Sequence, residues 1–152
     1  MTGAERPRLP ARERIDRSRA RAWVLQVLYR HEAEGRERPI LDVLAGVART
    51  RRIAESRLPM IRHILSTLEE HEEEVDEALT RVTRNWRLDR LSRIDRSILR
   101  IGAAEILYSD DVPGPVAIQE SVRLAERYGG NESAGFVNGV LDALYRTCVS
   151  SS

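Results

Sequence analysis

The chain has 152 residues, and all of its 25 basic side chains are arginine, against 24 acidic ones. This length suits one domain with a buried core, and a hydrophobic content of 41% excludes an intrinsically disordered chain despite 32% charge. No apolar run reaches the roughly 18 to 20 residues that cross a bilayer, the N-terminal segment lacks the apolar stretch of a secretory signal, and a lone Cys148 excludes an internal disulfide. We therefore expect a cytoplasmic protein that does not associate with membranes.

The net charge of +1 is an average over segments of opposite sign. Residues 1–30 carry eight arginines against three acids, whereas residues 69–77 hold seven acids and no base. Residues 81–100 return to seven arginines against two acids. Such segments produce local binding potentials that the net charge conceals, so the composition does not exclude a nucleic-acid partner.

Helical spacing of apolar residues recurs along nearly the whole chain, whereas the sustained alternation typical of strands is absent. We therefore predict an all-α fold of about seven helices. Pro7 and Pro10 favour extended backbone, so residues 1–13 are expected to form a flexible basic arm. The first helix is predicted from about residue 14 to residue 34, and Gly35 ends it.

Two further apolar patterns follow in the middle of the chain. Pro39 fits the first turn of a short second helix. A longer apolar stripe then covers residues 58–82 with the spacing of a helix. Glu72 occupies a position where this spacing requires an apolar residue, so we predict a break or bend near 70–73 that divides the stripe into two helices.

The segment 92–108 is apolar around nearly its whole circumference, which is typical of a buried central helix. Its two interior charges, Arg100 and Glu105, are expected to form a satisfied buried pair or to lie at an interface. After a loop rich in proline and aspartate, Pro115 begins the next helix and Gly129 ends it.

The last helix is predicted to start between residues 131 and 133. Gly135 and Gly139 are spaced four residues apart, which predicts close approach of its backbone to a neighbouring helix. The polar residues 149–152 are expected to fray, so the folded domain is predicted to span residues 14–148.

Residues that could carry chemistry are isolated from one another. His31, His63 and His71 lack the spacing of metal ligands, and nothing around Cys148 is typical of a nucleophile. The chain has no phosphate-binding glycine loop, and the acidic run 69–77 lacks the spacing and the glycine of a calcium loop. We therefore expect no enzyme activity, no cofactor and no metal, with His31 packed in the core and His71 in solvent.

Residues suited to recognition gather in the first helix. On a helical wheel, Leu25 and Tyr29 project away from the core side marked by Val24 and Leu28. This second face would suit base stacking or a protein partner, or it would be covered by other helices, and the sequence leaves these alternatives open. Arginine donates bidentate hydrogen bonds to phosphate, so the candidate phosphate contacts are Arg12, Arg14, Arg17, Arg19 and Arg21.

The chain resembles the NusB family of bacterial transcription antitermination factors over nearly its whole length and in the family's order. The resemblance is carried by RSRARAWVLQVLYRHE (17–32), IDRSILRIGAAEIL (94–107), DVPGPVAIQESVRLAERYGG (111–130) and FVNGVLDALYR (136–146). It implies two small helical subdomains that share one compact core. It also implies a factor that binds boxA-type RNA in ribosomal RNA leaders with ribosomal protein NusE. Together with other Nus factors and RNA polymerase, such a complex would let transcription continue past terminators.

The resemblance assigns roles to residues by matching position. The N-terminal arginines would contact RNA phosphates, Tyr29 and Phe136 would offer rings to bases, and Glu132 would lie near the RNA. Asp95 matches an acidic position that the family uses toward NusE. The family often has lysine where this chain has Pro115, so one positive charge expected on the RNA side is missing.

Two other functions fit parts of the pattern. A NusB-like domain precedes some ribosomal RNA cytosine methyltransferases, whose catalytic domain we do not expect in a chain of 152 residues. The second alternative is a helical homodimer that associates through Leu25 and Tyr29 and has no direct role on RNA. Light scattering with and without boxA RNA and NusE would separate the homodimer from the RNA-binding factor.

Overall fold

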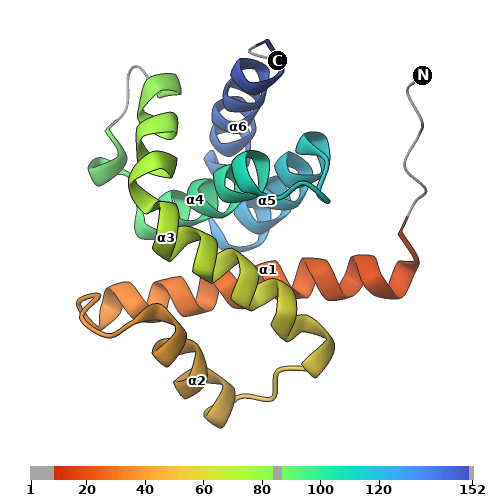
Figure 1. Ribbon diagram of the computed structural model, residues 1–152. Coiled ribbons are helices and arrows are strands. Elements are labelled where there is room, and N and C mark those ends of the chain that lie inside the picture. Colours follow the sequence, from red (N-terminus) through yellow and green to blue (C-terminus); the bar gives the residue numbers. More distant parts are fainter. Residues whose placement is uncertain (1–8, 84–86, 151–152) are drawn as a thin grey trace.

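The computed structural model describes residues 9–83 and 87–150, and within these ranges it contains helices and no strand. The predicted all-α class is confirmed. Six α-helices are present in these two ranges, with a 3-10 turn before α3 (Glu55–Arg57) and another before α4 (Leu88–Arg90). The helices are α1 (Ala11–Ala33), α2 (Ile40–Thr50), α3 (Leu58–Val82), α4 (Arg93–Tyr108), α5 (Gly114–Tyr128) and α6 (Ser133–Ser150) (Figure 1).

The bend predicted near 70–73 lies at His71, whose φ of −121° and ψ of 22° interrupt an otherwise continuous α3. The two helices expected here are therefore one element with a kink, which reduces the predicted seven helices to six. The expectation that His71 is solvated was wrong. Its ring stacks on Tyr108 of α4, with ring centroids 4.1 Å apart and planes 9° apart. This contact holds the bent part of α3 against α4.

The two ends of the described chain differ slightly from expectation. α1 begins at Ala11, so the last three residues of the expected arm are helical, and residues 1–8 lie outside the described part. α6 continues to Ser150, so two residues of the expected frayed tail are helical as well. Pro115 lies in the first turn of α5, as predicted. In the part of the chain that the structure covers, no helix combines the length and apolarity needed to cross a membrane.

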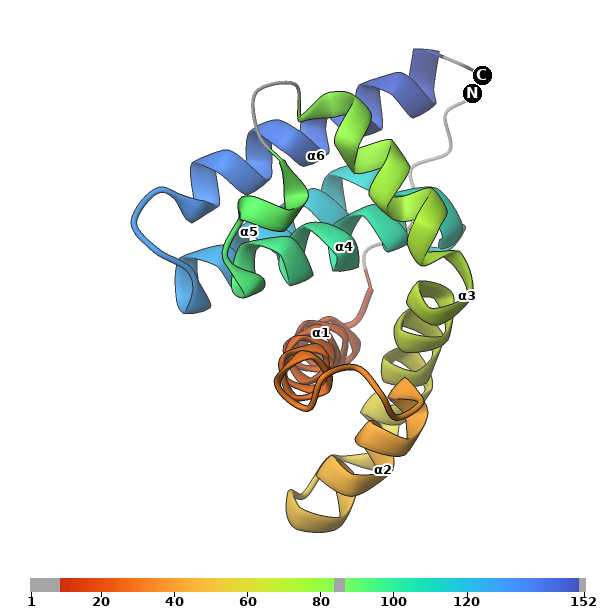
Figure 2. The same ribbon diagram turned by 90° about the vertical axis from the view of Figure 1, so that its left-hand side faces the viewer.

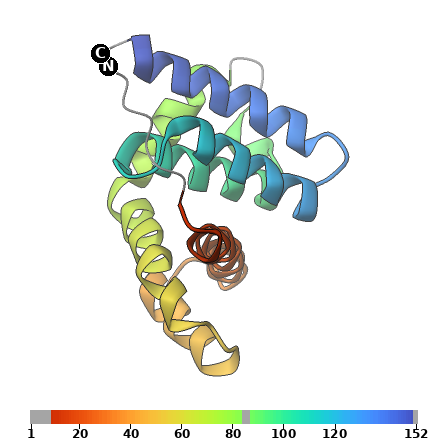
Figure 3. The same cartoon turned by 90° about the vertical axis from the view of Figure 1, so that its right-hand side faces the viewer.

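The helices form two groups that meet along α1. Figures 2 and 3 view the molecule along this helix, with α4, α5 and α6 on one side and α2 with the first half of α3 on the other. The second half of α3, beyond the kink, packs with the first group (Figure 1). One continuous cluster of buried apolar side chains joins both groups. These are the two small subdomains and the shared core that the resemblance implied.

The central position predicted for α4 is confirmed, because it packs against α1, α3, α5 and α6. Ile98, Leu99 and Ile101 are fully buried. At Gly102 an added Cβ would lie 2.5 Å from a methyl carbon of Leu141, so this glycine is what lets α4 and α6 approach closely. The close approach predicted at the two glycines of α6 was wrong, since an added Cβ there would meet no described atom within 4 Å.

Candidate nucleic-acid interface

One face of α1 is open to solvent along most of the helix, with Ala22 half-buried in the middle of it. Positions 12, 15, 19, 22, 26 and 29 repeat at steps of three and four residues and therefore share one side. Arg12 and Arg19 are exposed there, and Tyr29 retains 51% of its surface. Arg14 is exposed as well, but it lies seven positions before Arg21 and therefore on the same side of the helix as Arg21. The side chains of Arg12, Arg14 and Arg19 make no hydrogen bond or ion pair with any residue that the structure describes. Their charges are therefore free to meet an anionic partner.

Arg21 has a different environment, although it lies only two residues from Arg19. Its side chain is 3% exposed, and its Nε and Nη2 atoms donate to both carboxylate oxygens of Glu105, at 2.6 and 2.9 Å. Its Nη1 also donates to Glu120 Oε1 at 3.3 Å. The prediction that Arg21 contacts RNA is corrected, because this guanidinium is buried and its donors are already used to join α1 to α4 and α5.

Arg17 is intermediate between these two environments. It is half-buried, and its Nη2 donates to Asp111 Oδ2 at 3.1 Å and lies 3.7 Å from Glu13 Oε1. The expected pairing of Arg100 with Glu105 is also corrected. Glu105 binds Arg21, whereas Arg100 donates to both oxygens of Asp76 at 2.9 Å.

The sequence left open whether other helices cover the second face of α1. In the structure they cover Leu25 but leave Tyr29 exposed. Leu25 is only 3% exposed, because Val47 of α2 and Ile94 of α4 close around it. The prediction that Leu25 contacts a partner is therefore corrected. Tyr29, one turn further along, stays exposed at the edge of the same covered region.

Tyr29 borders an open groove of about 440 Å³ between α1, α2, the start of α4 and the end of α5. We call it the tyrosine groove, because Tyr128 from the last turn of α5 lines it as well. Tyr128 and Arg51 are not predictable from the sequence, since nothing in their local pattern indicates that α2 and α5 end beside α1. The full lining is Leu25, Gln26, Tyr29, Arg30, Val47, Thr50, Arg51, Ile94 and Tyr128.

The remaining predicted residues lie near the starts of α4 and α6. Glu132 is exposed in the turn before α6, whereas Phe136 is half-buried against the core and does not line the tyrosine groove. Asp95 lies in the first turn of α4, where its backbone N–H donates to Ser92 Oγ at 3.1 Å. Its Oδ1 atom is buried and has no hydrogen-bond partner among the described residues. Asp95 as a whole is half-buried, so a partner could meet the carboxylate only through the part of it that is not buried.

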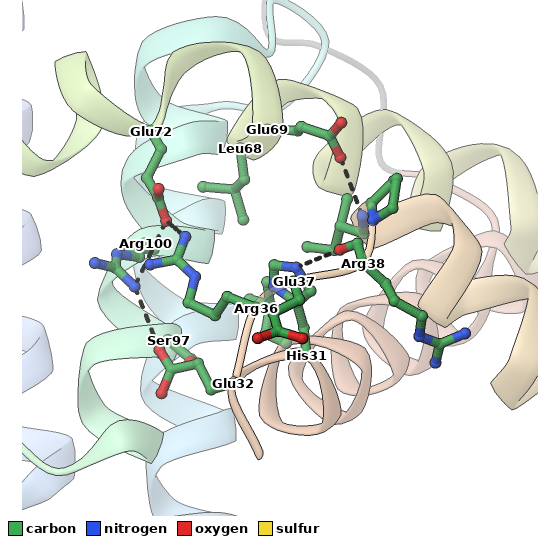
Figure 4. Close-up of a pocket in the computed structure, with 13 residues that line it drawn as sticks. His31, Glu32, Arg36, Glu37, Arg38, Leu68, Glu69, Glu72, Ser97 and Arg100 are labelled. Carbon is green, nitrogen blue, oxygen red and sulfur yellow. Dashed lines mark hydrogen bonds and ion pairs between the residues drawn. The ribbon is translucent and has the colours of Figure 1, made fainter. Parts of the chain in front are cut away.

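Two acids of the acidic run of α3, Glu72 and Asp76, are bound by arginines. Glu72 pairs with Arg36 and lies 3.8 Å from Arg100, which also lies 3.5 Å from Glu32 of α1 (Figure 4). Burial lowers the pKa of Arg100, but the hydrogen bonds that it donates to Asp76, together with the charges of the nearby acids, outweigh burial and raise that pKa above its ordinary value. These contacts fasten α1 and α3 to α4.

His31 lies beside this cluster of charges. It is half-buried, and its Nε2 atom lies 2.9 Å from the backbone oxygen of Arg38 (Figure 4). The histidine is therefore packed at the edge of the core, and its contact holds the loop between α1 and α2.

Comparisons with known proteins agree with this architecture. The model of the NusB family matches residues 18–146. The transcription antitermination protein NusB of Desulfitobacterium hafniense (strain DSM 10664 / DCB-2) is 34% identical over 128 residues, which cover 84% of this chain and 86% of that protein. The NusB protein of Geobacter sulfurreducens is 35% identical over 133 residues, covering 84% and 91% of the two chains.

Solved structures show the same similarity. NusB of T. maritima superimposes with a TM-score of 0.77 at 31% identity, over 86% of this chain and 90% of that one. A chain from the crystal structure of antitermination factors NusB and NusE in complex with dsRNA gives a TM-score of 0.76 at 27% identity, over 91% and 99% of the two chains.

Proposed function

The chain belongs to the NusB family, and from this premise we propose that it is a transcription antitermination factor that binds boxA-type single-stranded RNA in nascent ribosomal RNA together with ribosomal protein NusE. It would act by binding alone, within a complex that includes other Nus factors and RNA polymerase. The observation that carries the proposal is the exposed face of α1, where free arginines lie in line with an exposed tyrosine.

The arginines supply the part of binding that does not depend on sequence. The guanidinium fork matches the oxygens of a phosphate, and Arg12, Arg14 and Arg19 hold no internal acid that would have to be displaced first. Neutralising phosphates releases counterions, so this contribution weakens as salt rises. On its own it would bind any RNA.

Selectivity then requires contact with bases. Sequence-specific proteins usually read single-stranded RNA, whose unstacked bases lie on aromatic rings, and Tyr29 offers such a ring on the same face as the arginines. The similar NusB–NusE structure contains dsRNA, but the exposed ring in this chain favours an unpaired strand. We propose that Phe136 and Glu132 lie along the same RNA, and that NusE binds near Asp95 at the start of α4.

The test is a binding titration with labelled boxA-type RNA and a scrambled RNA of equal length, each with and without NusE. The proposal predicts tighter binding of the boxA-type RNA and a larger difference between the two RNAs when NusE is present. Equal affinity for both RNAs under both conditions would contradict it.

One observation supports the homodimer as a second function. Ile15 is 52% exposed on the same face of α1 as Arg19, and an exposed isoleucine is suited to a protein contact. A homodimer formed through this face would cover the arginines. Light scattering that shows a dimer, unchanged by boxA RNA and NusE, would favour this function over RNA binding.

A further inference from the structure

We propose that the tyrosine groove receives one unpaired nucleobase of the bound RNA, with Tyr128 as a second stacking surface and Arg51 as a contact to the adjacent phosphate. The inference rests on the proposed function and makes it more specific. It assigns a role to two residues, on α5 and α2, that neither the sequence pattern nor the resemblance singled out.

The shape of the groove suits a planar, largely apolar group. Tyr29 and Tyr128 both line it, although 99 positions separate them in the sequence, and their exposed fractions are 51% and 37%. The apolar side chains of Leu25, Val47 and Ile94 also line the groove, and the first two of them are buried. Its volume of about 440 Å³ lies within the range usual for sites that hold small ring systems. Bases of any identity have a face that stacks on such rings.

The charge of the groove indicates an anionic occupant. Its lining includes Arg30 and Arg51 and no carboxylate, whereas three other grooves formed by described residues each include at least one acid. Arg30 donates to Glu34 at 3.0 Å, but Arg51 forms no ion pair within the part of the chain that the structure covers. Arg127 lies 5.6 Å from the centre of the Tyr128 ring and adds a further positive charge at the rim. An acidic protein segment could pair with these arginines but would leave the two tyrosine rings without a stacking partner, whereas a nucleotide combines a ring with a phosphate.

The rim carries groups able to read the edge of a base. Gln26 is exposed and its side chain makes no hydrogen bond to another described residue, so its amide retains both donors and its acceptor. Thr50 donates its hydroxyl to the backbone oxygen of Val47 at 3.3 Å and keeps its own oxygen as an acceptor. These two side chains give the groove the means to prefer one base.

The groove continues the face of α1 that carries the free arginines. Arg19 and Gln26 are seven positions apart, which is about 10 Å along an α-helix. A strand whose phosphates meet Arg12 and Arg19 would therefore reach the groove without leaving α1. Phe136 lies outside the groove, so Tyr128, and not Phe136, shares a base with Tyr29.

The test is an abasic scan of boxA-type RNA, in which each nucleotide in turn is replaced by one without a base. For the wild-type protein, one position should lose at least about fivefold in affinity, because stacking of one base contributes that much or more. For Tyr128→Ala, removing the same base from the RNA should hardly change the affinity, since that base has already lost its contact with the ring. Tyr128→Phe should restore the wild-type profile.

Arg51→Ala supplies a second variant that does not disturb packing, because Arg51 is exposed at the end of α2. Its matched control is Arg49→Ala, which removes the same charge from the same helix outside the groove. Arg51→Ala should weaken the binding of boxA-type RNA more than Arg49→Ala does, and the difference between the two affinities should shrink at high salt.

The outcomes separate this inference from the proposed function. If wild-type protein binds boxA-type RNA selectively but Tyr128→Ala keeps the wild-type abasic profile and Arg51→Ala equals Arg49→Ala, the groove does not hold a base, and a protein partner becomes its better occupant. If the wild-type protein shows no selectivity for boxA-type RNA, the proposed function itself fails. The inference is supported if removing the base at one position weakens binding to the wild-type protein but not to Tyr128→Ala.

Discussion

The two long faces of α1 carry the same residue type with opposite consequences. On the inner face Arg21 is buried and bound by two carboxylates, whereas on the outer face Arg19 is exposed and forms no ion pair with a described residue. Burial makes the first arginine part of the fold, since an unpaired charge there would be strongly unfavourable. Exposure leaves the second available for a ligand. The function of an arginine in this helix is therefore decided by what the other helices bring beside it.

The largest effect is expected from Arg21→Ala. Removing one partner of a buried ion pair leaves Glu105 charged and unpaired, so we expect a loss of about 3–5 kcal/mol in the free energy of unfolding. The stability of Arg21→Lys should lie between those of the wild type and Arg21→Ala, because lysine keeps the charge but cannot form the bidentate contact. Urea denaturation gives both values. A loss below about 1 kcal/mol for Arg21→Ala would show that the pair does not hold α1 in place.

Arg19→Ala is the matched control for that experiment. The same change of residue, two positions away, should alter the free energy of unfolding by no more than about 0.5 kcal/mol, because the side chain is solvated. If the two variants were equally destabilised, the contrast between the faces of α1 would not exist.

The next largest effect is expected from Tyr29→Ala. Loss of a stacking ring should weaken the binding of boxA-type RNA by about 1–3 kcal/mol, or roughly 5- to 150-fold in affinity. Scrambled RNA should lose much less, since its binding depends mainly on phosphates. Fluorescence anisotropy with both RNAs measures the difference, and equal losses would exclude base stacking on Tyr29.

Arg17 sharpens the comparison because it lies between the two faces. Asp111 and Glu13 already hold its guanidinium, so Arg17→Ala should weaken RNA binding less than Arg19→Ala does. Asp111→Asn should free Arg17 and tighten RNA binding slightly. These affinities can be compared at one low salt concentration, and a larger loss for Arg17→Ala than for Arg19→Ala would contradict the ranking.

The smallest effect concerns Glu34 at the C-terminal end of α1. Hydrogen bonds from Arg38 and Arg30 hold the pKa of this carboxyl below its ordinary value of 4.5. A lowered pKa in the folded state stabilises the protein above the unfolded value, and this contribution disappears as pH falls through the folded value. Glu34→Gln should therefore lower stability slightly near neutral pH and leave it unchanged in strong acid, as thermal unfolding across this range would show. An equal difference at every pH would exclude this linkage.

The sequence predicted the features that depend on spacing along one helix. The apolar period located the helices, the all-round apolar character of residues 92–108 identified the central one, and Glu72 marked the kink. These signals are local, because a polar residue at a position where the helical spacing requires an apolar one can be recognised from its neighbours in the sequence.

The errors concern contacts between distant segments. Arg19 and Arg21 look alike in sequence, and the difference arises from Glu105, which lies 84 positions away. Leu25 is buried because α2 and α4 close over it, and Tyr128 joins the groove because α5 ends beside α1. Helical periodicity gives the faces of a helix, but it does not state which neighbour covers each face.

The central claim is that the exposed, unpaired arginines of α1 bind RNA phosphates. The most direct measurement is the salt dependence of boxA-type RNA affinity for a variant with Arg12, Arg14 and Arg19 changed to alanine. Its control changes three exposed arginines outside α1, Arg49, Arg62 and Arg90, and so has the same net charge. We predict that the slope of log affinity against log salt is less steep by about 2 for the α1 variant, because each of three lost phosphate contacts on a single strand contributes about 0.7. The control should keep the wild-type slope. Equal slopes for the wild type and the α1 variant would contradict the claim.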